Sequence, residues 1–206
     1  MWCVPKLTPI FRERMDDILV LYTEPLKPGH ELHCFDETPK QLLGTPHGEI
    51  KAAPKKLRCV DYQYSRNGRV NIFVAVAPFH GTRTVSVTAR RTAKDTADFL
   101  WEYCMVTHAS AEHIHLVLDN LNTHAEKSLR SVFGIEKAQA FFLRVSLHFT
   151  PCHASWLNMA EIEIGCVKRQ GLRRRIPRRE VLEETARNIV LWRNQNVCKI
   201  RWAFTK

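Results

Sequence analysis

The stretch that most constrains the fold is VNIFVAVAPF, residues 70–79, which is apolar at both odd and even positions. A strand with two apolar faces belongs in the middle of a sheet whose faces are both covered. The stretch is far too short to cross a bilayer, so no membrane partner is expected. The flanking sequence therefore has to supply neighbouring strands and covering helices.

Three further segments before and after this stretch read as strands. ELHCFDET, residues 31–38, is predicted as a short strand that ends at Pro39. KLRCVDYQYS, residues 56–65, alternates, and RNGR after it predicts a hairpin turn because Asn-Gly readily adopts positive φ. RTVSVTARR, residues 83–91, is rich in Val and Thr. The strands at residues 56–65, 70–79 and 83–91 are expected to form an antiparallel meander.

The pattern then changes to alternating helices and strands. Residues 8–25 and 92–109 have helical spacing and begin at Thr8 and Thr92. HIHLVLD, residues 113–119, is a strand, and two short helices divided at Gly134 lead to a last strand at residues 146–151. From residue 155 the chain is helical in two pieces split at Pro177. The order predicts an α/β fold with a mixed sheet and flanking helices, as in ribonuclease-H-like proteins.

Three carboxylates fall where such a fold would place a site. Asp119 ends a buried strand, Asp36 lies within the first strand, and Glu161 lies in the helix after the last strand. Converging carboxylates repel each other unless divalent cations such as Mg²⁺ are held between them. Two ions of this kind support phosphodiester chemistry. The alternative for Asp119 is a helix cap, a common role for an aspartate in a turn.

The formal charge of +10 is concentrated near the C-terminus. Between residues 168 and 179 seven of twelve residues are basic and none is acidic, which indicates a polyanionic partner such as nucleic acid. A solvated basic surface is the alternative. The predicted phosphate contacts are Lys168, Arg169, Arg173, Arg174, Arg175, Arg178 and Arg179.

The seven cysteines are scattered and contain no CxxC pair, which argues against a disulfide framework and against a structural zinc site. We expect them to be reduced and mostly to fill the core. The first residues lack the layout of a secretion signal, so an intracellular, cytoplasmic protein is expected.

Five blocks of sequence carry a resemblance to a known family. In order, they are FDET…QLLG, DYQYSRNGRVNIFVAVAP, RRTAKDTADFL, LVLDNLNTH and HFTPCHASWLNMAEIEIGCVKRQGLRRRIP. They resemble bacterial insertion-sequence transposases of the mariner-related DDE superfamily, in the group numbered six-thirty, over nearly the whole chain. The resemblance implies a ribonuclease-H-like fold, two Mg²⁺ or Mn²⁺ ions, and DNA nicking with strand transfer by a 3′-hydroxyl. It also implies transposon ends and target DNA as substrates, and a homodimer.

Carried over by motif, the family's catalytic and metal-binding carboxylates fall on Asp36, Asp119 and Glu161. Glu163 is the alternative third carboxylate, and it would point about 200° away from Glu161 on a helix. In the turn after Asp119, Asn120 and His124 are expected as auxiliary residues, with His124 donating to a phosphate or orienting water. A place in the first turn of the next helix is the alternative for His124.

The chain departs from the family in three ways. Thr38 stands where relatives usually have lysine, the spacing from Asp119 to Glu161 is long, and the helix-turn-helix region of a full transposase is not seen. We expect residues 1–30 to form a helical lead or linker and residues 31–206 the catalytic domain. A non-catalytic DNA-binding remnant and a metal-dependent ribonuclease-H-like nuclease are the alternative functions.

Overall fold

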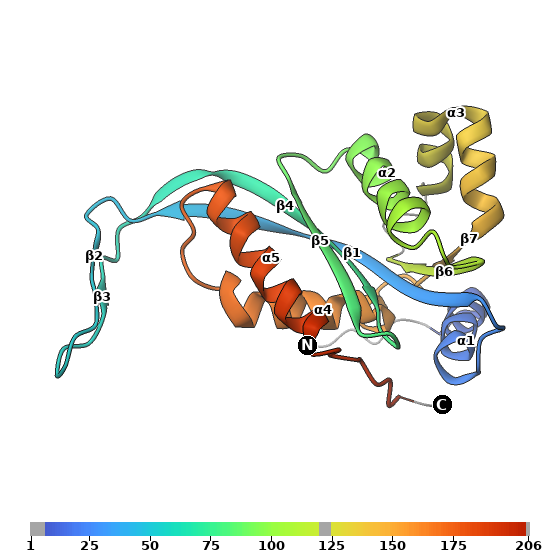
Figure 1. Ribbon diagram of the computed structural model, residues 1–206, viewed down its shortest axis with the longest axis horizontal. Coiled ribbons are helices and arrows are strands. Elements are labelled where there is room, and N and C mark those ends of the chain that lie inside the picture. Colours follow the sequence, from blue (N-terminus) through green and yellow to red (C-terminus); the bar gives the residue numbers. More distant parts are fainter. Residues whose placement is uncertain (1–6, 120–124, 205–206) are drawn as a thin grey trace.

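A computed structural model of the protein describes residues 7–119 and 125–204, and Figure 1 shows how the elements are arranged. The main sheet has five strands in the order β5-β4-β1-β6-β7. Strand β1 pairs antiparallel with β4 and parallel with β6, so the sheet is mixed, as predicted. Its strands are β1 His30–Gly44, β4 Ser65–Ala77, β5 Thr82–Thr88, β6 His113–Leu118 and β7 Val145–Phe149.

Helices cover both faces of this sheet (Figure 1). Phe73 and Ala75 of β4 pack toward α2 and α3, whereas Ile72, Val74 and Val76 pack toward the helices of the other face. The apolar stretch at residues 70–79 is therefore buried from both sides, as its composition predicts. The helical segments are α1 Pro9–Thr23, α2 Ala93–Trp101, the π-helical η1 Glu102–Thr107, α3 Ala125–Arg144, the 3₁₀ turn η3 Ser155–Leu157, α4 Met159–Val167, the π-helical η4 Lys168–Leu172 and α5 Arg179–Gln195.

The predicted helix boundaries are confirmed where local capping determines them. The Thr8 hydroxyl accepts a hydrogen bond from the Phe11 amide at 3.2 Å, at the start of α1. Thr92 and Asp95 cap α2 reciprocally. Gly134, with φ of 74°, interrupts α3 where the helix break was predicted. None of the described helices is both long and apolar enough to cross a membrane.

The first strand does not end at Pro39 but continues to Gly44. Strand β6 pairs with β1 only as far as Phe35, so beyond that residue β1 has β4 as its partner on one side. A proline has no N–H to donate, which is tolerated at a strand edge. Pro39 is exposed and lies opposite Asn71 in this half-paired part of β1.

The Asn-Gly pair is also used differently from the prediction, because RNGR lies inside β4 rather than in a hairpin turn. The register of β1 against β4 shifts between Gln41 and Leu43, opposite Asn67 and Gly68. Gly68 has φ of 107°, so its conformational freedom serves a β-bulge. The predicted strand at residues 56–65 is reduced to β3 Cys59–Val60.

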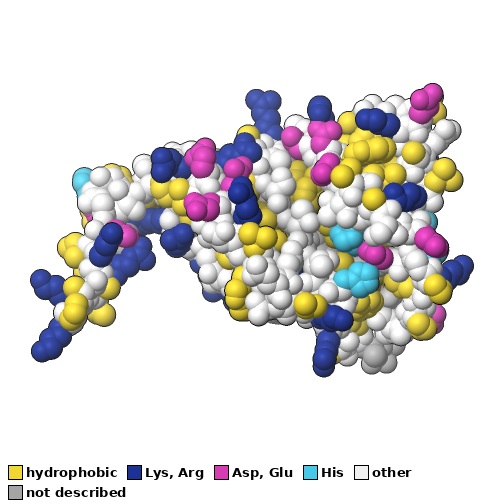
Figure 2. All heavy atoms as spheres, viewed as in Figure 1, with side chains coloured by type: hydrophobic (Ala, Val, Ile, Leu, Met, Phe, Trp, Pro, Cys, Tyr) yellow, Lys and Arg dark blue, Asp and Glu magenta, His cyan; other side chains and the backbone are white. Residues whose placement is uncertain are grey.

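Residues 45–64 instead form an arm that projects from the body (Figure 1). Its only regular structure in the described part is the small ribbon of β2 Glu49–Ile50 and β3. Lys51, Lys55, Lys56 and Arg58 are exposed on it, and Figure 2 shows basic side chains along the arm.

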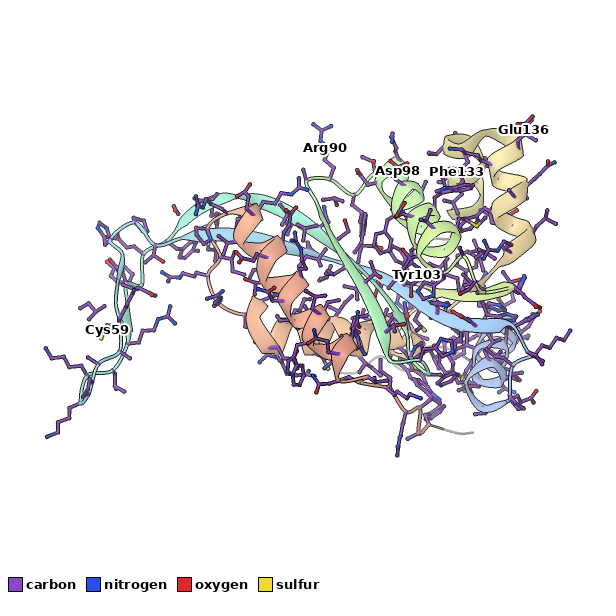
Figure 3. The ribbon with its side chains drawn as sticks, viewed as in Figure 1. Cys59, Arg90, Asp98, Tyr103, Phe133 and Glu136 are labelled. Atoms are coloured by element: carbon purple, nitrogen blue, oxygen red, sulfur yellow. The ribbon has the colours of Figure 1, made fainter. Side chains whose placement is uncertain are left out.

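The six cysteines in the described part of the chain are free thiols, as predicted. Cys34 and Cys104 are buried in the core, but Cys59, labelled on the arm in Figure 3, and Cys152 are exposed. The expectation that the cysteines mostly fill the core is therefore wrong.

Candidate active site

Two of the predicted carboxylates lie at the carboxyl ends of neighbouring parallel strands. The last paired residues of β1 and β6 are Phe35 and Leu118, and Asp36 and Asp119 each follow directly. The Thr150 hydroxyl donates to Asp119 Oδ1 at 3.1 Å, which holds this carboxylate at the end of β6. Parallel pairing therefore brings together two acidic residues that are far apart in the sequence.

The third carboxylate comes from the first turn of α4. Asn158 caps this helix by accepting a hydrogen bond from the Ala160 amide at 3.1 Å, and its side-chain amide donates to the Phe35 carbonyl oxygen at 2.9 Å. One side chain thus starts the helix and ties it to the residue before Asp36. Glu161, three residues after the cap, is exposed.

The charges of the other two carboxylates act on Asp36. Burial first, and then the charges of Glu161, Glu37 and Asp119, raise the pKa of Asp36 to about 8 against the opposing hydrogen bond from the Glu37 amide. That bond measures 2.8 Å to Asp36 Oδ1. A carboxyl group among like charges is hard to ionise unless a cation compensates them.

Glu163 lies on a different side of α4 and is fully buried between two arginines. Its Oε1 is 2.7 Å from Arg193 Nε and 3.2 Å from Arg83 Nε, and Oε2 accepts from Arg193 Nη2 at 2.9 Å. This glutamate anchors α4 to β5 and α5, and it contacts the arginines rather than Asp36.

Two lysines flank the carboxylates. Lys168 lies seven residues after Glu161 on the same helical face, and its Nζ donates to Thr38 Oγ1 at 2.6 Å. Thr38 is on the same face of β1 as Asp36. Lys40, two residues further along this face, donates to the Leu172 and Arg174 carbonyl oxygens. Burial, and then the charge of Lys168, lower the pKa of Lys40.

The predicted basic run is only partly exposed to solvent. Arg175 donates to the carbonyl oxygens of residues 61–63, at the base of the arm. Arg179 pairs with Glu183 at 2.7 Å and also donates to the Val87 carbonyl oxygen. The exposed members of the run are Arg169, Arg173, Arg174, Arg178 and Arg179.

Sequence reasoning did not single out Thr150, Asn158 or Lys40. An asparagine just before a helix is a recognisable cap, so Asn158 could have been found from SWLN-x-x-E. Thr150 and Lys40 are recognised by contacts with distant residues, and no local pattern signals them. The predicted auxiliary residues Asn120 and His124 lie outside the described residues.

The mixed sheet, its strand order and its flanking helices define a ribonuclease-H-like fold, with acidic residues gathered at the ends of its parallel strands. A family model described as DDE superfamily endonuclease matches residues 31–183. The chain belongs to this family. A search of curated proteins found no match.

Solved structures of the Mos1 transposase share the fold. The Mos1 strand transfer complex aligns with a TM-score of 0.58 at 10% identity, and the paired-end complex with the left transposon end at 0.56 and 11%. The mariner Mos1 paired-end complex with Mn aligns at 0.56 and 11%. In each case the alignment covers 96% of this chain and 63% of the Mos1 chain, so this chain spans less than two thirds of that length.

Proposed function

We propose that the chain is the catalytic domain of a transposase, residues 31–206, which cuts DNA strands and transfers them through a 3′-hydroxyl. The observation that carries this proposal is the placement of Asp36, Asp119 and Glu161. Two come from adjoining parallel strands and one from a helix tied to the same point. Within the DDE family, the sequence motifs support membership of the insertion-sequence transposases related to mariner.

The donor set fits divalent magnesium or manganese. Three carboxylates offer hard oxygen ligands, and burial together with the neighbouring carboxylate charges raises the pKa of Asp36, an effect that a bound cation would oppose. Asp36, Asp119 and Glu161 would hold two such ions. When bound, such ions activate the attacking oxygen and stabilise the leaving one.

The chain's own residues prepare this arrangement. The Thr150 hydroxyl fixes the orientation of Asp119, and the amide of Glu37 fixes that of Asp36. Asn158 sets the position of the first turn of α4, and so of Glu161, relative to β1. Groups held in advance lower the cost of organising the site during reaction.

DNA would reach this site along its basic side. Lys168 contacts Thr38, two residues after Asp36 on the same face of β1, and Lys40 lies two residues further along; both would contact a phosphate next to the reacting one. Arg169, Arg173 and Arg178 would extend the contact outward, whereas Arg175 and Arg179 would contribute while also holding the arm and β5. Phosphate contacts of this kind predict binding that weakens steeply with salt.

The substrates and assembly follow from the same proposal. The Mos1 structures are described as complexes with a transposon end and in strand transfer. We propose transposon ends and target DNA as the substrates of this chain, and a homodimer as its working form.

The test is nicking of supercoiled plasmid with Mg²⁺ or Mn²⁺. The wild-type chain should convert it to open circles, and Asp119→Asn should not. Asp98→Asn, an exposed aspartate on α2 labelled in Figure 3, is the matched control and should retain activity. Nicking that persists in Asp119→Asn would contradict the assignment. DNA binding without nicking would instead show a non-catalytic remnant, and cleavage confined to an RNA–DNA hybrid would show a ribonuclease.

A further inference from the structure

Four side chains from three separate segments converge at the start of β1. Glu31 and His33 lie on β1, His80 is in the turn between β4 and β5, and His108 follows η1. Glu31 Oε2 lies 2.9 Å from His33 Nε2, 3.2 Å from His108 Nδ1 and 3.8 Å from His80 Nδ1. In the described residues, Glu31, His33 and His108 are the one group of three potential metal ligands within 4.8 Å of one another.

This histidine–glutamate cluster is separate from the carboxylate site. Strand alternation directs Glu31 and His33 toward the face covered by α2 and directs Asp36 to the opposite face. The His33 side chain is 0% exposed, those of His108 and Glu31 are 15% and 18% exposed, and that of His80 is 53% exposed. The cluster is thus closed on the inside and open toward His80. Figure 2 shows histidine surface beside acidic surface on one face of the molecule.

We propose that Glu31, His33 and His108 bind Zn²⁺, with His80 as the fourth ligand of a tetrahedral site. Zinc bonds of about 2.0–2.2 Å at tetrahedral angles place neighbouring ligand atoms about 3.3–3.5 Å apart. Glu31 Oε2 lies 2.9 and 3.2 Å from the nitrogens of His33 and His108, close to this value. His80 Nδ1 is 3.8 Å from Glu31 Oε2 but lies outside the group of three, so the exposed His80 side chain would move inward to complete the tetrahedron. Imidazole nitrogens with a carboxylate oxygen suit zinc, whereas an all-oxygen set suits magnesium.

The second nitrogen of His33 has the partner that a zinc ligand requires. Tyr103 lies on the π-helical segment η1, and its hydroxyl is 2.7 Å from His33 Nδ1. Figure 3 shows Tyr103 where the end of α2 meets β1. If Nδ1–H donates to this hydroxyl, the lone pair of Nε2 faces the metal, which is the usual outer arrangement of zinc-bound histidine. The wide π-helical turn leads directly to His108, and such turns often accompany functional sites.

A metal here would join the start of β1, the β4–β5 turn and the end of η1. The side chain of Glu31 already contacts His80 and His108 from the other two segments. Metal binding should therefore stabilise the packing of the three segments. A ligand that binds the folded but not the unfolded chain raises the melting temperature. The cysteine pattern gives no sign of this site, because its ligands are His and Glu residues that lie up to 77 positions apart in the sequence.

The test uses Co²⁺ as a coloured substitute for Zn²⁺ with the chelator-treated full chain. One Co²⁺ per chain should give the intense visible spectrum of tetrahedral coordination, and Zn²⁺ should displace it and raise the melting temperature. His80→Ala, at an exposed turn, should weaken Zn²⁺ binding without unfolding the chain. His47→Ala, an exposed histidine on the arm, is the matched control and should leave binding unchanged.

Three further variants test the ligands of this site and its separation from the carboxylate site. Tyr103→Phe should weaken Zn²⁺ binding about 10- to 100-fold, as loss of an outer partner does, and His108→Asn should weaken it more. Asp119→Asn should leave the tetrahedral spectrum unchanged, so failure of the proposed DNA chemistry and failure of this site are distinguishable. Absence of the tetrahedral spectrum, or its survival in His108→Asn, would overturn the proposal and leave a metal-free hydrogen-bonded cluster.

Discussion

Two glutamates of α4, two residues apart, lie in opposite electrostatic surroundings. Glu163 is buried with Arg83 and Arg193, so its charge is compensated within the protein. Glu161 is exposed beside Asp36, where the neighbouring charges are carboxylates. The same residue type stabilises the fold at one position and leaves negative charge available for a cation at the other. The proposed function depends on the uncompensated charge at Glu161.

The largest expected effect on stability comes from removing the charge of Glu163, which is paired with arginines. Glu163→Gln leaves the buried guanidinium of Arg83 and the partly buried one of Arg193 without their carboxylate, and it should lower the free energy of unfolding by about 3–5 kcal/mol. Urea denaturation measures this change. Glu161→Gln is the control on the same helix and should change stability by no more than about 0.5 kcal/mol. Equal losses from the two variants would mean that the two environments do not differ as described.

A second prediction concerns Glu161, the exposed glutamate. Glu161→Gln should reduce plasmid nicking about 100- to 1000-fold, equivalent to about 3–4 kcal/mol in the barrier, because one metal-binding oxygen set is lost. Initial nicking rates with saturating Mg²⁺ measure it. Glu184→Gln, an exposed glutamate on α5, should be neutral in the same assay. If Glu161→Gln nicks DNA at the wild-type rate, the third carboxylate has to be sought elsewhere.

A third prediction is a gain in stability. The pKa of Asp36 is about 8 in the folded chain against an ordinary value of 3.8, so between these pH values the folded chain binds more protons than the unfolded chain. The stability of the metal-free chain should therefore fall as pH rises from about 4 to 8. Asp36→Asn should remove this slope and raise the melting temperature at pH 8.5. Melting curves recorded with chelator measure the gain. Added Mg²⁺ should reduce the difference in melting temperature between the wild-type chain and Asp36→Asn.

Local signals predicted the helices and most strands well, but the strand expected at residues 56–65 is mostly part of the arm, and the antiparallel strands of the main sheet are β1, β4 and β5. Thr8, Thr92 and Gly134 set helix ends through contacts within a few residues, so their roles are visible in the sequence. Pro39 and Gly68 were misread because their roles depend on where β6 stops and where β1 shifts register. Strand pairing determines both, and the local sequence around Pro39 and Gly68 does not reveal it.

The same limit applies to the candidate site. The strand-end motif LVLD and the helix motif LN-x-x-E indicated the carboxylates, but the hydrogen bond from Thr150 to Asp119 spans 31 residues of sequence. The contact of Lys168 with Thr38 spans 130. Proximity of this kind is created by the packing of α4 on the sheet, and no local pattern encodes it.

Strand β1 runs without interruption from Glu31, past Asp36, to the base of the arm at Gly44. Within the sheet its second half pairs with β4 alone, clear of β6, and the Leu43 amide also donates to the Ile176 carbonyl oxygen at 2.9 Å. One continuous strand therefore joins the base of the arm to Asp36, with no loop between them. A partner bound to the arm would be connected to the proposed site through this strand and through the segment that follows α4.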